Sequence, residues 1–186
     1  MGAAVGVSPC RSSHLPVSKA GAYGNWLPEN EAVGEEEDKT SVARDFVSKA
    51  SIVINAPLAN VWDSLVNPKM AKQYFWGAEV SSDWQVGSPI TFRGEFDGNQ
   101  YEEKGEILQF QPENLLQYSH WSDLENLPDV PENYRNWTFK LAQENKAVIL
   151  SVTEDNIPTE KQKERSDEYW AGVLQTIKQL LEEESR

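Results

Sequence analysis

Residues 169–181, YWAGVLQTIKQLL, carry the clearest structural signal in this chain of 186 residues. Their large apolar side chains recur at intervals of three and four, at Trp170, Val173, Leu174, Ile177, Leu180 and Leu181. Because an α-helix turns once about every 3.6 residues, this spacing gathers them on one stripe. The stretch predicts an amphipathic helix of about twenty residues, with Thr159 and Gln162 as a capping box at its start.

The segments before this helix alternate apolar and polar residues, which is typical of strands with one buried face. The predicted strands are residues 46–54, 90–96, a short stretch around Tyr101, 105–110, 115–121, 133–141 and 146–154. Asp97-Gly98 predicts a hairpin turn. Residues 58–66 and the segment from Pro68 predict two short helices, because apolar residues there follow helical spacing and proline favours a first helical turn.

This order of elements predicts an α+β fold of the helix-grip type. One face of an antiparallel sheet must be covered, and the last helix is the element long enough to cover it. We therefore expect a curved antiparallel β-sheet wrapped around a long C-terminal helix, with two short helices closing one end. Residues 46–186 form the predicted domain. Residues 1–45 are predicted to be a disordered N-terminal tail, since Gly, Ala, Ser, Pro and an acidic run dominate them.

Composition and charge exclude several classes of function. Lys and Arg number 17 and Asp and Glu number 30, so the formal net charge is −13. This balance disfavours binding to nucleic acid, which needs a basic face, and binding to anionic membranes. No apolar stretch approaches the roughly 20 residues that span a bilayer. A single cysteine, Cys10, permits no internal disulfide and favours a cytoplasmic location.

The sequence offers no motif for a cofactor or for metal binding. It contains neither CxxC nor a Cys/His cluster, and neither GxGxxG nor a Walker pattern. Its two histidines are His14, in the predicted tail, and His120, on a predicted strand. No nucleophile with a GxSxG context accompanies them. The carboxylates of Glu102, Glu103, Asp129 and Glu132 are interpreted as solvated rather than paired.

Several blocks of the sequence resemble one family. Residues 54–57 and 61–65 are similar to the opening of the superfamily of birch pollen allergens and START lipid-transfer proteins (SRPBCC). Residues 74–79, 82–88, 101–108, 129–134, 154–156 and 169–182 resemble its branch of heat-shock-protein-90 ATPase activators (AHSA-type). The resemblance covers roughly residues 46–184. It implies a helix-grip fold, which hosts ligand carriers, cyclases, hydrolases and cochaperone domains.

Aromatic side chains provide the candidate site. Seven tryptophans occur in the chain, and such rings either fill a core or line a cavity. The residues predicted to line a ligand cavity between the sheet and the last helix are Phe75, Trp76, Trp84, Phe92, Tyr101, Tyr118, His120, Trp121, Trp137 and Trp170. The alternative is that these rings simply pack the core.

Three classes of function remain open at this point. The first, which we favour, is binding of a small apolar or amphipathic molecule. The second is a chaperone-associated protein that acts through its surface. Known activators carry a further N-terminal domain, and only 45 weakly patterned residues precede the domain here, which weakens this second interpretation. The third is an enzyme of the cyclase or hydrolase type that uses His120 or a buried carboxylate.

Overall fold

The computed structural model describes residues 44–183 as one antiparallel sheet and three α-helices. The predicted tail, apart from Arg44 and Asp45, lies outside the described residues. The described elements in chain order are β1 (Phe46–Ile54), α2 (Leu58–Val66), α3 (Pro68–Tyr74), β2 (Glu79–Ser82), β3 (Pro89–Phe96), β4 (Asn99–Gln111), β5 (Leu115–Ser122), the 3-10 turns η1 (Asp123–Glu125) and η2 (Pro131–Asn133), β6 (Arg135–Glu144), β7 (Ala147–Ile157) and α4 (Glu160–Glu183).

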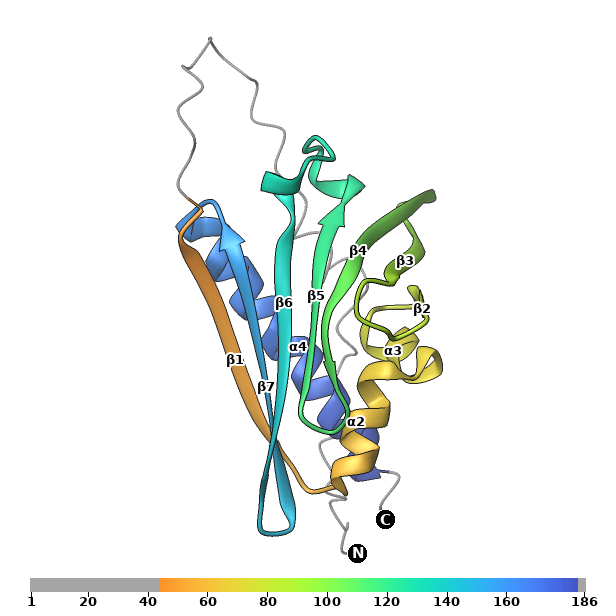
Figure 1. The fold of residues 1–186 in the computed structure, drawn as a ribbon, viewed down its shortest axis with the longest axis vertical. Helices are drawn as coiled ribbons and strands as arrows, with labels where there is room; N and C mark the ends of the chain where they lie inside the picture. The colour runs from red at the N-terminus through yellow and green to blue at the C-terminus, as the bar shows by residue number, and fades with distance from the viewer. Residues whose placement is uncertain (1–43, 184–186) are drawn as a thin grey trace, which may run out of the picture.

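The seven strands lie in the order β1-β7-β6-β5-β4-β3-β2, and each neighbouring pair is antiparallel. In Figure 1, α4 crosses diagonally behind this sheet, while α2 and α3 lie together at its lower right. We call the sheet face that packs on α4 the inner face and the opposite face the outer face. The predicted α+β helix-grip architecture is confirmed.

Strict alternation along the central strands assigns side chains to the two faces. On β5, every second residue from Leu116 to Ser122 is buried, while the residues between them are half-buried. On β6, Arg135, Trp137, Phe139 and Leu141 are buried in the same way. Successive side chains of a strand point to opposite sides, so these buried residues form the inner face. The core lies between them and α4.

The helix predicted from residues 169–181 is confirmed as the C-terminal part of α4. Trp170, Val173, Leu174, Ile177 and Leu181 are buried, whereas Leu180 lies half-buried at the margin of the stripe. The Thr159 hydroxyl accepts a hydrogen bond from the Gln162 backbone N–H at 3.2 Å. This bond satisfies one of the backbone donors that have no partner within the first turn of a helix.

Two features of the sheet differ from the sequence prediction. The strand β2 was not predicted, because Glu79-Val80-Ser81-Ser82 is short and has a single apolar residue. The prediction also placed a strand boundary before Gly105, whereas β4 continues from Asn99 to Gln111. Gly105 is needed inside this strand, because a Cβ atom there would lie 1.6 Å from the Ser119 carbonyl oxygen. The β3–β4 hairpin uses Asp97-Gly98 as predicted, and both residues have positive φ.

The two short helices close one end of the space between sheet and α4, as predicted. Val61, Trp62 and Leu65 of α2 join the core, and the buried Tyr74 hydroxyl of α3 donates to the Ser64 carbonyl oxygen at 2.9 Å. Within residues 44–183, no helix is long and apolar enough to cross a membrane.

Candidate functional site

Six of the ten predicted site residues lie together between the inner face and the helices, and we call this group the aromatic cluster. Its members are Phe75, Phe92, Tyr118, His120, Trp137 and Trp170. Trp137 lies at its centre: its ring stacks on His120 with centroids 3.8 Å apart and meets Trp170 edge-on at 4.7 Å. Phe92 joins the sheet rings to Phe75 at 5.5 Å. Rings from the sheet and from α4 therefore converge between the inner face and the helix.

The other four predicted residues lie at the margin of the cluster or outside it. Trp76 contacts Tyr169 of α4, with ring centroids 5.2 Å apart, and Tyr169 in turn contacts Trp137 of the cluster. Trp84 lies beside Phe110 at 6.4 Å. Tyr101 is buried where its ring approaches Gly94. Trp121 lies on the outer face, where its indole N–H donates to the Pro128 carbonyl oxygen at 3.2 Å.

A group of charged side chains continues the inner face beyond the aromatic cluster, and Arg135 is its centre. One Arg135 nitrogen, Nη1, lies 2.7 Å from Glu154 Oε1, and the other, Nη2, lies 3.0 Å from Glu125 Oε2. The second Glu154 oxygen accepts a hydrogen bond from the Trp170 indole N–H at 2.7 Å. Glu154 thus joins β7, β6 and α4, and it couples the charged side chains to the aromatic cluster.

A second carboxylate, Glu103, joins the same group from β4. Its Oε1 accepts from the Ser122 hydroxyl at 2.9 Å, and its Oε2 lies 3.4 Å from His120 Nε2. Ser122 therefore directs its proton toward a carboxylate and not toward the imidazole, which is not the arrangement that activates a serine nucleophile. We call Glu103, His120, Glu125, Arg135 and Glu154 the charged network.

The charged network contains more acid than base. Three carboxylates face one guanidinium and one imidazole, and all five side chains are at least largely buried. Burial raises the pKa of the Glu125 carboxyl; Arg135 and His120 oppose this effect, and Glu154 and Glu103 add to it. A charge removed from water is stable only when partners compensate it. Arg135 and His120 therefore compensate the ionised form of Glu125 only in part.

Two buried polar groups near the network have no hydrogen-bond partner among the described residues. They are the Trp137 indole N–H and the Ser166 hydroxyl, and both side chains are at most 3% exposed. Trp137 faces Glu154 directly across the β6–β7 ladder. Buried donors in folded proteins nearly always have an acceptor, so an indole N–H without one suggests that a ligand or water atom supplies it. Within residues 44–183, no cluster of three or more His, Cys, Asp or Glu side chains is arranged to hold a metal ion.

The sequence contained a signal for the charged network. Arg135 lies in phase with Trp137 and Phe139, and Glu154 lies in phase with the apolar series of β7. The prediction that Glu103 is solvated is wrong, because Glu103 alternates with Tyr101 on the inner side of β4 and is only 6% exposed. Period-two alternation assigns a charged residue to the same face as its apolar neighbours.

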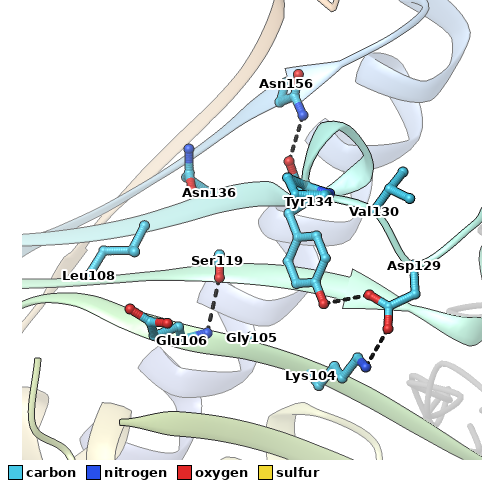
Figure 2. A pocket seen from close by; sticks show the side chains of 11 residues that line it. Lys104, Gly105, Glu106, Leu108, Ser119, Asp129, Val130, Tyr134, Asn136 and Asn156 are labelled. Atoms are coloured by element: carbon cyan, nitrogen blue, oxygen red, sulfur yellow. Dashed lines mark hydrogen bonds and ion pairs between the residues drawn. The ribbon is translucent and has the colours of Figure 1, made fainter. Parts of the chain in front are cut away.

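A groove of about 720 Å³ lies on the outer face, and none of the predicted site residues lines it. Figure 2 shows Tyr134 extending over the sheet, with its hydroxyl directed at Asp129 and Lys104 beyond it. Tyr134 donates to Asp129 at 2.7 Å, and Lys104 Nζ lies 2.5 Å from the same carboxylate. The segment of residues 122–134 therefore contributes to both faces. Glu125 belongs to the charged network, and Asp129 and Tyr134 line the outer groove.

The curved sheet, the long helix and the ring-lined interior between them define a protein of the helix-grip class. Residues 55–182 match the model of the family described as "Activator of Hsp90 ATPase homolog 1-like protein". The chain belongs to this family, as its sequence blocks had indicated.

Solved structures agree with this assignment. The solution structure of ChR145 from Cytophaga hutchinsonii is 43% identical, with a TM-score of 0.69, over 77% of this chain and 98% of that chain. CV1439 from Chromobacterium violaceum is 21% identical (TM-score 0.60, 73% and 96% covered). The Aha1 dimer from Colwellia psychrerythraea is 19% identical (TM-score 0.57, 73% and 96% covered). The last two support the fold alone. No curated protein matches the chain.

Proposed function

We propose that this domain binds a small apolar or amphipathic molecule between the inner face of the sheet and α4. The apolar part of the ligand contacts the aromatic cluster, and its polar part contacts the charged network. The observation that carries the proposal is a buried charged network beside converging aromatic rings, together with an indole N–H that has no acceptor among residues 44–183. Ligand sites in proteins combine these features, a mostly apolar lining and a few convergent polar groups.

Stability alone is a poor explanation for the charged network. Removing charges from water costs several kcal/mol for each ion. A protein in which apolar residues of similar volume replace a buried ion pair is often as stable as the original, or more stable by about 1–4 kcal/mol. Arg135, Glu154 and Glu103 are each at most 6% exposed, and they occupy positions where the alternation of the strands otherwise places apolar residues. Buried ionisable groups of this kind are candidates for functional sites.

We propose that a ligand enters at the edge of the aromatic cluster. Trp76 and Tyr169 are half-buried there, and their ring centroids lie 5.2 Å apart, joining the turn after α3 to the helix α4. Trp76 has a φ of 47°, a left-handed conformation that is unusual for a bulky residue. Strain of this type is often found at ligand sites, where surrounding structure maintains it. We propose that these two rings separate when a ligand enters.

The test is a titration of the full chain with fatty acids, flavonoids and other apolar probes, followed by calorimetry and thermal unfolding. A matched pair of variants separates the faces: Trp137→Phe alters the inner cluster, and Trp121→Phe makes the same change on the outer face. We expect saturable binding that weakens in Trp137→Phe and is unchanged in Trp121→Phe. A bound ligand should stabilise the fold by ~2.7 kcal/mol at a hundredfold excess over its Kd. Binding to none of the probes would contradict the proposal.

A chaperone-associated role is the second candidate. The family description names an activator of the Hsp90 ATPase, and the outer groove beside Tyr134 leaves a surface feature open to a partner. This role becomes the favoured function if the inner face binds no small molecule. The cytoplasmic location inferred from the single cysteine remains a prediction.

A further inference from the structure

We infer that the ligand is an amphipathic organic amine, and that its cationic nitrogen is held by the charged network at Glu125. This inference rests on the proposed function and specifies the chemistry of the ligand. It follows from the charges, the open hydrogen-bonding positions and the aromatic surroundings of the network.

The charge balance of the network favours a cation. Glu103, Glu125 and Glu154 carry three negative charges when ionised, and Arg135 supplies one positive charge. Even a protonated His120 brings the cations only to two. A buried group of charges is stable when opposite charges balance, so a further positive charge would bring this one closer to balance. A ligand ammonium supplies that charge without any rearrangement of the strands.

The charged network offers a ligand one carboxylate oxygen, at Glu125. Both oxygens of Glu154 have hydrogen-bond partners, in Arg135 and Trp170. Glu103 accepts from Ser122 through Oε1, and its Oε2 lies at an ion-pair distance of 3.4 Å from His120 Nε2 that is not a hydrogen bond. Glu125 meets Arg135 through Oε2, and the described residues provide no partner for its Oε1. An ammonium has only donors to offer, so it fits this oxygen.

An anionic ligand fits the same place poorly. The two terminal nitrogens of Arg135 already point at Glu154 and Glu125, and Nη2 also lies 3.5 Å from Gln162 Oε1. A ligand carboxylate would have to displace one of these partners and would then lie beside the remaining carboxylates. Like charges at short range in a poorly solvated site repel strongly.

The rings next to the network supply a second attraction for a cation. Trp170 donates to Glu154, Trp137 stacks on His120, and Tyr169 lies 5.0 Å from Trp170. Faces of aromatic rings attract cations, most strongly when the ring is tryptophan. The Trp137 indole N–H, buried and without a described acceptor, adds a further requirement. It indicates an oxygen acceptor near the ligand nitrogen, as in a hydroxyl-bearing amine.

The test compares ligands of equal chain length that differ only at the polar end: octylamine, octanol, octanoate and 1-aminooctan-2-ol. Calorimetry on the full chain near neutral pH, where the amines are protonated, should give octylamine an affinity about tenfold above octanol and higher still above octanoate. The amino alcohol should bind more tightly than octylamine, and Trp137→Phe should remove that further gain.

Two variants of equal net charge control for attraction to an acidic protein. Glu125→Gln removes the proposed carboxylate, and Glu132→Gln removes an exposed carboxylate of the same segment. We expect Glu125→Gln to lower the affinity for octylamine about tenfold and to leave octanol unchanged, whereas Glu132→Gln should affect neither. Octanol binding as tightly as octylamine would overturn this inference and leave the proposed function standing. Binding of none of the four compounds would overturn both.

Discussion

The two faces of the sheet place charged side chains in opposite circumstances. On the inner face, Arg135 is 4% exposed and holds two carboxylates away from water. On the outer face, Lys104 and Asp129 form an ion pair of similar geometry, with side chains 39% and 42% exposed. The charged atoms of both groups lie within ion-pair distance, but only the charges on the inner face are shielded from solvent. The contrast shows that distance alone does not indicate what an ion pair contributes, because the solvent around it decides that contribution.

The largest expected difference between the two faces comes from removing each cation. Arg135→Ala should lower the free energy of unfolding by about 3–5 kcal/mol, because it leaves Glu154 and Glu125 buried without their partner. Lys104→Ala should lower it by less than about 1 kcal/mol. Urea denaturation of both variants and the wild type measures the two values. Equal losses at the two positions would mean that the difference in burial has no energetic consequence.

A smaller difference should appear in the dependence of stability on pH. Four residues separate Glu125 from Asp129, yet their pKa values shift in opposite directions. Burial raises the pKa of Glu125 above 4.5. Hydrogen bonds from Lys104 and Tyr134 lower the pKa of Asp129 below 3.8. The two carboxyls therefore contribute to stability in opposite pH ranges.

Protonated Glu125 stabilises the fold below pH 4.5, and this contribution is lost as the pH rises through its higher folded pKa. Ionised Asp129 stabilises the fold above pH 3.8, and this contribution is lost as the pH falls through its lower folded pKa. The stability of the wild type relative to Glu125→Gln should thus fall with rising pH, and its stability relative to Asp129→Asn should rise. Urea midpoints at several pH values between about 3 and 7 provide the measurement. Two trends of the same sign would contradict the assignment of the residues to different environments.

Most of the fold could be predicted from local patterns, and the reasons are visible in particular elements. The stripe from Trp170 to Leu181 repeats often enough to identify α4, and Asp97-Gly98 has the turn chemistry that a two-residue hairpin needs. The strand β2 could not be predicted, because four residues with one apolar side chain resemble a loop and pair only once β3 is in place. The boundary of the domain near Phe46 stays a prediction.

The candidate site could be predicted only in part. Rings such as Phe92, Trp137 and Trp170 were expected to converge, because alternation and helical spacing direct them inward. Trp121 was grouped with them, but its position in β5 is out of phase with Tyr118 and His120 and faces outward. The pairing of Arg135 with Glu154 and Glu125 depends on the register of β6 against β7 and on the path of η1, which no local pattern specifies.

The most direct test of the central claim, that the charged network serves a ligand rather than the fold, is to replace it with uncharged residues. The variant Arg135→Met/Glu125→Leu/Glu154→Gln removes the three charges of the Arg135 ion pairs, and the glutamine amide retains an acceptor for the Trp170 N–H. Its free energy of unfolding and its affinity for the octyl compounds are measured beside the wild type. We predict stability equal to the wild type or higher by about 1–4 kcal/mol, together with loss of octylamine binding. A variant destabilised by several kcal/mol, or one that still binds octylamine like the wild type, would contradict the claim.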